Sequence, residues 1–315
     1  MAEAAVTRRR RWPRVNVPRA AAAALARVVR GGADFLTHLY TKAGEDEIFF
    51  LAGGIAFDVL FGAVPFFLML VGVFGMVLSR VVDDPRKAAV DYIVNILPPT
   101  ESVVNRTYHI VDLVLQGRTS FGVIGLVLFL WVSTRLIATL RTSLKEIFDL
   151  PEERGILEGK VFDLQMVLVA GTLFLANTGI TLVLDAAQKW GIRLVGTRWL
   201  DVETVQNVWG RLLAFVFIFL MFLLIYRYLP RRRTPWRMAL VAAVFTSVAW
   251  EALKSAFAVY VSFATSWATV YGALVTPIIL VLWIYYSAMV FILGGEIAHV
   301  DQLMRVRRAQ RELLE

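Results

Sequence analysis

Residues 48–78 read IFFLAGGIAFDVLFGAVPFFLMLVGVFGMVL, an apolar run of 31 residues whose only charge is Asp58. A helix that crosses the hydrocarbon core of a bilayer needs about 20 mostly apolar residues. Backbone N–H and C=O groups find no water in lipid, so such a segment satisfies its hydrogen bonds only as a helix. The run therefore predicts a transmembrane helix over Ile48–Leu78.

Five further apolar runs follow the first. They are Phe121–Leu140, Val161–Leu184, Val208–Tyr228, Met238–Phe263 and Thr269–Ala298. The sequence thus predicts an all-α, polytopic membrane protein with six transmembrane helices. Hydrophobic residues make up 58% of the 315-residue chain and charged ones 18%, which excludes an ordinary soluble enzyme and a disordered chain. The chain has no cysteine, which excludes disulfides, iron–sulfur clusters and thiol catalysis.

Lysine and arginine are unevenly divided between the two sides of this six-span topology. The side that holds both termini carries 22 of them, and the opposite side carries 9. Because basic residues accumulate in cytoplasmic loops, we expect both termini in the cytoplasm. The chain then divides into a basic N-terminal segment with an amphipathic helix (1–47), a membrane domain (48–300) and a C-terminal tail (301–315).

The first outer connection, Ser79–Ser120, is unusually long. Pro98–Pro99 divides it, and apolar residues recur at helical spacing on both sides of this break. The pattern predicts an amphipathic helical hairpin over residues 80–118, which caps the bundle or lies in the outer interface.

Asp58, Glu251 and Lys254 are charged residues deep inside predicted spans, where a charge is costly and usually faces a cavity or a partner. Asp58 is roughly 15 Å into span one, Glu251 is near the middle of span five, and Lys254 is one turn further on the same face. We expect the three to converge on a polar cavity that titrates protons or forms part of a substrate pathway. The alternative is a structural Glu251–Lys254 ion pair with Asp58 neutral or hydrated.

Four further span residues are candidates for the same pathway or for its gate. Pro65 and Pro277 can kink or break spans one and six, as at transporter binding sites, or can serve packing alone. Asn177 in span three is an interhelical hydrogen-bond donor. Glu296 closes span six at the cytoplasmic interface, where exposure is cheap, and is a candidate gate or anchor.

Charged residues near the cytoplasmic ends of the spans have simpler interpretations. Arg135 can extend its side chain to the interface, and Asp163 needs no partner there. The connection between spans four and five is strongly basic and is expected to contact anionic lipid headgroups. Its arginines are Arg231, Arg232, Arg233 and Arg237.

Several segments together resemble the motifs of one known family, the YihY/BrkB membrane proteins. These segments are Ala52–Pro65 (AGGIAFDVLFGAVP), Trp131–Ser133 (WVS), Tyr226–Pro230 (YRYLP), the set Trp250, Lys254, Phe257 and Tyr260, and finally Tyr271–Ala273, Trp283, Ser287–Ala288 and Leu293–Glu296 (LGGE). The resemblance covers roughly residues 30–300. Asp58 and Gly62 depart from it, since the family usually has an aromatic residue and a serine there.

The resemblance implies a bacterial inner-membrane protein with six spans. The family has been labelled a tRNA-processing ribonuclease and a virulence or serum-resistance factor. It has also been linked to lipid transport across the cell envelope. These labels are implied by the family resemblance alone and do not follow from the composition or the motifs of this chain.

The residues do not favour the ribonuclease label. Phosphodiester hydrolysis needs a metal held by clustered histidines and carboxylates, or a general acid–base pair. The topology places His109 outside, whereas His38 and His299 are cytoplasmic, and no phosphate-loop motif is present. The basic run Arg8–Arg11 is accounted for by topology and by contact with anionic lipid. We expect no enzymatic activity, no metal or cofactor and no nucleic-acid partner.

Two classes of function remain. The first is transport, or assistance of transport, of a lipid or another amphiphilic or anionic substrate across or out of the membrane. Membrane lipids and a periplasmic envelope protein would then be its partners. The second is a non-transporting scaffold or assembly factor. The sequence leaves the substrate, the direction, the energy source and the oligomeric state open.

Overall fold

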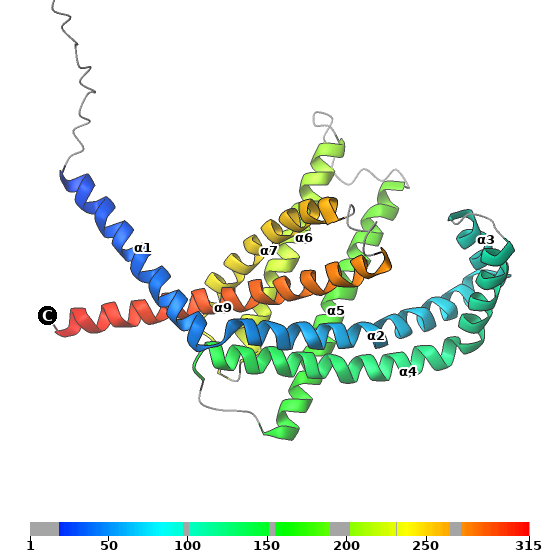
Figure 1. The fold of residues 1–315 in the computed structure, drawn as a ribbon, viewed down its shortest axis with the longest axis horizontal. Coiled ribbons are helices and arrows are strands. Elements are labelled where there is room, and N and C mark those ends of the chain that lie inside the picture. The colour runs from blue at the N-terminus through cyan, green and yellow to red at the C-terminus, as the bar shows by residue number, and fades with distance from the viewer. Residues whose placement is uncertain are drawn as a thin grey trace, which may run out of the picture.

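The computed structural model describes residues 19–96, 101–150, 155–189, 202–230, 232–264 and 272–314, and every regular element within them is helical (Figure 1). The all-α prediction is therefore confirmed for this part of the chain. The helices are α1 (Arg19–Glu45), α2 (Ile48–Val81), α3 (Pro85–Ile96), α4 (Glu101–Ile147), α5 (Ile156–Lys189), α6 (Val202–Tyr228), α7 (Trp236–Ala264) and α9 (Val275–Leu314), with the 3₁₀ turn η2 at Gly272–Leu274.

Five of these helices are long and apolar enough to cross a membrane, namely α2, α4, α5, α7 and α9. They contain the predicted spans one, two, three and five, and residues 275–298 of span six. In α6 the apolar stretch within the described residues is shorter, Ala214–Tyr228. A multi-pass membrane protein is confirmed, although the described residues establish five spans rather than six.

The outer connection differs from the predicted hairpin. Helix α3 accounts for the first half, but the residues after Pro98–Pro99 form no separate second helix, because α4 continues unbroken to Ile147. The physical reason is that no proline occurs between residues 100 and 150, so nothing stops this helix. Helix α3 packs against α4, and Arg86 Nη2 lies 2.6 Å from Asp112 Oδ2.

The membrane helices pack as two pairs (Figure 1). Helix α2 lies along α4, and α7 lies along α9. Helix α5 joins the first pair through α4, α6 joins the second through α7, and the contact between α2 and α9 connects the two. We call α2 with α4 the glycine arm and α7 with α9 the aromatic arm, after the residues at their contacts.

The two arms share a core at one end only. We call this the terminal end, because α1 and the last turns of α9 project from it, and the opposite end, near α3, is the far end (Figure 1). Toward the far end, large apolar side chains such as Phe74, Val127 and Ile278 are exposed. The core at the terminal end comprises Ile48, Ala52, Ile55, Leu144, Ile147, Phe148, Tyr226, Leu229, Met238, Ala239, Ala242, Ala243, Ala288, Met289, Phe291, Ile292 and Ala298.

The glycine arm is held by direct contact between backbones. A side chain added at Gly72 of α2 would collide with the backbone of Gly122 of α4, and one added at Gly125 would collide with Met69. Small residues permit such close approach between membrane helices, where van der Waals packing replaces the hydrophobic effect.

The aromatic arm is held by large rings instead. The ring centroids of Trp250 on α7 and Trp283 on α9 are 5.7 Å apart, and Phe257 lies 4.8 Å from Trp283. Phe222 of α6 lies 5.8 Å from Trp250, so the same ring cluster attaches α6. These separations fall in the range where aromatic pairs attract each other.

Candidate functional site

Asp58 lies at the contact between α2 and α4, and its side chain is only 3% exposed. Arg135 Nε lies 2.8 Å from Asp58 Oδ1, and the Thr139 hydroxyl donates a hydrogen bond to Oδ2 at 2.5 Å. Arg135 and Thr139 are four residues apart on α4, so they project from the same face. The sequence predicted that Asp58 converges with Glu251 and Lys254, whereas its partner in the structure is Arg135, which was expected only to reach the interface.

The Arg135 side chain remains half exposed, at 49%, beside two aromatic rings. Its guanidinium carbon lies 5.6 Å from the ring centroid of Phe57 and 5.9 Å from that of Phe61. Leu144, which faces Gly295 of α9, follows Arg135 by about two and a half helical turns, so the two side chains project to opposite sides of α4. The Asp58–Arg135 pair therefore lies on the surface of the glycine arm that is turned away from α9.

Glu251 and Lys254 pair with each other on α7. Lys254 Nζ lies 2.7 Å from Glu251 Oε1, and the two side chains are 41% and 42% exposed. Of the three residues predicted to converge, the structure brings these two together on the aromatic arm and pairs Asp58 on the glycine arm. Each mid-helix carboxylate thus has a cation of its own.

The two prolines leave their helices unbroken. Helix α2 continues through the buried Pro65 to Val81. Pro277 is the third residue of α9, in the first turn, where backbone N–H groups have no partner within the helix. Its missing N–H therefore removes no helical hydrogen bond, so of the two interpretations of Pro277 the structure does not show the kink or break inside span six. Asn177 lies in α5, and its side chain is outside the described structure.

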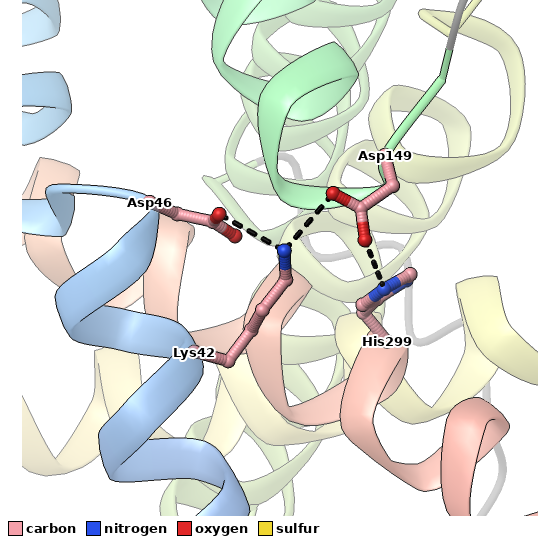
Figure 2. A network of polar contacts seen from close by, with 4 residues as sticks. All are labelled: Lys42, Asp46, Asp149 and His299. Carbon is pink, nitrogen blue, oxygen red and sulfur yellow. Dashed lines mark hydrogen bonds and ion pairs between the residues drawn. The ribbon is translucent and has the colours of Figure 1, made fainter.

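A polar network that the sequence reasoning missed lies at the terminal end (Figure 2). Lys42 Nζ of α1 is 3.0 Å from Asp46 Oδ1 and 2.9 Å from Asp149 Oδ1, while Asp149 Oδ2 is 3.2 Å from His299 Nε2. Burial alone would lower the pKa of Lys42, but its hydrogen bonds to Asp149 and Asp46 raise it above the ordinary value. The four side chains connect α1, the turn before α2, the turn after α4 and α9. Aspartates just past helix ends are ordinary turn residues, so the sequence gave no signal for this network.

Glu296 is completely buried in the same region, which corrects its predicted place at an exposed interface. Helix α9 does not end there but continues to Leu314. The two preceding residues explain the burial, because Gly294 and Gly295 carry no side chain that would hold neighbouring helices away. A side chain at Gly294 would collide with Thr246 of α7.

Two further polar contacts hold the ends of α5 and α6. Asp163, predicted to need no partner, is buried and lies 3.3 Å from Nε of Arg141, which joins α5 to α4. Arg227 at the end of α6 donates a hydrogen bond to the Thr234 carbonyl and lies 4.8 Å from the ring of Trp236. The first contact joins two helices, and the second fastens the connection between α6 and α7.

The predicted basic turn lies between α6 and α7. Arg232 and Arg233 are exposed there, Arg237 is exposed in the first turn of α7, and Arg231 is outside the described residues. The guanidinium groups of Arg233 and Arg237 can reach phosphate oxygens, and their binding to lipid stays a prediction.

Comparison with known proteins places the chain in a family. Residues 39–313 match the family described as "Virulence factor BrkB". Related proteins include a "UPF0761 membrane protein" of Aeromonas salmonicida (strain A449), 26% identical over 87% of this chain and 90% of the relative. Another, of Cronobacter sakazakii (strain ATCC BAA-894), is 25% identical over 88% of this chain and 92% of the relative. No solved structure matches the chain. The match over most of its length confirms the resemblance, and the chain belongs to the BrkB family of membrane proteins.

Proposed function

We propose that this protein transports, or helps to transport, a lipid or another amphiphilic anion through the inner membrane of a bacterium, without acting as an enzyme. The observation that carries the proposal is that the buried core shared by the two arms lies at the terminal end, whereas large apolar side chains are exposed along the whole length of both arms. Two arms joined at one end can change their separation at the other, which is how many transporters alternate access.

The Asp58–Arg135 pair, in which only the arginine is half exposed, supports an amphiphilic anion as the substrate class. A guanidinium at mid-depth in a membrane helix is costly unless it has a partner or a ligand. Asp58 neutralises its charge, while the rings of Phe57 and Phe61 offer an apolar surface directly beside it. Phosphate or carboxylate oxygens can accept hydrogen bonds from the remaining guanidinium N–H groups, as acyl chains lie against the rings.

The topology that we propose has six spans and cytoplasmic termini. Helix α6 has 27 residues, or roughly 40 Å of helix, which exceeds the ~30 Å hydrocarbon core. An even number of spans returns the chain to its starting side, in agreement with α1 and the end of α9 projecting from the same end (Figure 1). Reporter fusions after Leu150 should report the cytoplasm and fusions after Trp190 the outside; the reverse pattern would overturn the orientation. The far end, with α3, would then face a periplasmic partner.

Reconstitution tests the transport proposal directly. Purified protein in liposomes should move labelled anionic lipid between leaflets, and Arg135→Gln should slow this movement by about tenfold, or 1.4 kcal/mol. The matched control is Arg308→Gln, which removes an exposed arginine from the last turns of α9. If the wild-type protein moves neither lipid nor solute, alone or with envelope partners, the transport proposal is wrong and a scaffold is the better description.

Distance measurements between spin labels test whether the arms move. The chain has no cysteine, so each introduced pair is unique. Labels at Val73→Cys on α2 and Ile278→Cys on α9 report the far end, and labels at Glu146→Cys and Leu303→Cys report the terminal end. We expect a broad distribution of distances at the far end that shifts with substrate, and a narrow one at the terminal end. Equally narrow distributions would favour a rigid scaffold.

A further inference from the structure

Glu296 is a buried carboxyl group without a hydrogen-bond donor. Its side chain is inaccessible to solvent, and neither oxygen has a partner within the described structure. Asp46, which is 7% exposed, lies beside it, and its Oδ2 likewise has no partner because only Oδ1 reaches Lys42. Three carboxylate oxygens are therefore buried in one place without a donor.

The surroundings do not supply the missing positive charge. The charged groups that act on Glu296 are Asp46, Lys42 and Asp149, so three carboxyl groups share one ammonium. His299 of α9 is engaged at Nε2 by the other oxygen of Asp149. The buried residues that α2, α4 and α7 contribute to the adjoining core are uncharged. These are Ile48, Ala52, Leu144, Ile147, Ala239, Ala242, Ala243 and Thr246.

A buried carboxylate without a donor is strongly unfavourable, and two adjacent ones also repel each other. One proton removes both problems, because a protonated carboxyl group donates a hydrogen bond to the carboxylate next to it. We propose that Asp46 and Glu296 form a proton-binding site that keeps the terminal end of the bundle closed. The same proton also removes one negative charge from the cluster, so that the ammonium of Lys42 neutralises a larger share of the negative charge that remains.

Loss of this proton to the surrounding water would loosen the terminal end. Both carboxyl groups would then be ionised, and the turn before α2 would repel α9. The contacts of Lys42 and Asp149 shown in Figure 2 would remain, together with the Arg307–His38 contact between α9 and α1. Closure of this end is therefore linked to pH. The inference concerns proton binding and does not require that the protein transports lipid.

Thermal unfolding of the full-length protein in nanodiscs tests the site. The folded state holds one proton that an unfolded glutamate releases above about pH 4.3. Because the folded state binds more protons, its stability should fall as the pH rises from about 5 to about 9. The permanently neutral Glu296→Gln should flatten this slope by the contribution of one proton. The matched control Glu45→Gln changes an exposed carboxyl next to Asp46 and should keep the wild-type slope.

Counting protons gives a second measurement. On unfolding in weak buffer near pH 7, the wild-type protein should release about one proton more than Glu296→Gln. If Glu296→Gln does not fold, Asp46→Asn replaces it. That change leaves Glu296 without a neighbouring carboxylate with which it could share a proton. Equal slopes and equal proton release in the wild type and the neutral variants would overturn the proposal.

A single cysteine tests the link to closure. Ala298 of α9 is 1% exposed, so Ala298→Cys should react slowly with a water-soluble thiol reagent at low pH. After normalisation to an exposed Arg308→Cys, its reaction should accelerate several-fold at high pH. In the Glu296→Gln background it should stay slow throughout. Acceleration that persists in that background would show that another group controls this end, and the proposal would be wrong.

Discussion

The glycine arm and the aromatic arm hold two membrane helices together in opposite ways. In the glycine arm the backbones of α2 and α4 touch. This contact is possible because Gly72 and Gly122 have no side chains. In the aromatic arm the rings of Trp250 and Trp283 fill the space between α7 and α9. Lipid tails are as apolar as leucine, so both arms depend on packing rather than on removal of apolar surface from water.

The two contacts differ in how much relative movement of their helices they tolerate. A backbone contact has no rotamers to adjust, so α2 and α4 move as one body. Large rings can slide and tilt past one another while they stay in contact. We therefore expect the glycine arm to be the rigid half of the molecule and the aromatic arm the half that adapts.

The strongest test of this comparison is a side chain placed in the glycine contact. Gly72→Leu should destabilise the fold by more than about 3 kcal/mol, because the obstacle is the backbone of α4 and cannot move aside. The control is Gly53→Leu on the same helix, where nothing lies within 4 Å of an added Cβ. Yield of folded protein and its unfolding temperature measure the effect. Similar behaviour of the two variants would show that the arm is not held by its backbones.

The ion pair that attaches α5 gives the next largest effect. Arg141→Met leaves the buried Asp163 without its cation and should cost about 3 kcal/mol. The double variant Arg141→Met with Asp163→Leu removes the stranded charge and should recover most of this loss. Urea unfolding or heat stability in detergent measures both. A single variant as stable as the double one would mean that α5 is held by other contacts.

A smaller loss is expected in the aromatic arm. Trp283→Ala removes two ring contacts, with Trp250 and Phe257, and should cost about 1–3 kcal/mol. Trp131→Ala, at an exposed site on α4, serves as the control. Heat stability separates the two. If Trp283→Ala were as damaging as Gly72→Leu, the aromatic contact would be as rigid as the glycine contact, and the distinction between the arms would fail.

The smallest effect concerns lipid contact rather than stability. Arg233 lies in the exposed turn before α7 and Arg237 in the first turn of α7, and each arginine contributes roughly 1 kcal/mol toward anionic lipid. The variants are Arg233→Gln and Arg237→Gln. We expect each variant to keep its unfolding temperature and to retain less anionic lipid on purification. Arg233→Lys keeps the charge and should behave like the wild type. A fall in stability would place these residues in the structure of the aromatic arm itself.

The membrane helices were predictable because their signal is local. A run such as Ile48–Leu78 determines its own helix through its apolar length, with no contribution from the rest of the chain. The unbroken course of α4 was not predicted. The pair Pro98–Pro99 indicated two separate helices on either side, whereas the lack of proline between residues 100 and 150 did not attract attention as a sign of one continuous helix.

The polar site depended on distances that sequence cannot supply. Depth along a helix placed Asp58 and Glu251 at similar levels, but depth does not determine which helices are neighbours. The partner of Asp58 followed from the close contact of α2 with α4, which brings Arg135 within reach. Glu296 was assigned to a helix end because the apolar run stops near Ala298, whereas α9 continues for another four turns as an amphipathic helix.

Helix α9 has a mechanical consequence. Its 40 residues form a rod of roughly 60 Å, and Glu296 lies near its midpoint, where the terminal end clamps it. A straight rod held at its middle is a lever with two nearly equal limbs. A displacement of the limb at the far end is then transmitted, with opposite sign, to the other limb, where it is small at Leu303 near the pivot and largest at Leu314. A partner bound to those last turns could sense events on the other side of the membrane, or impose them.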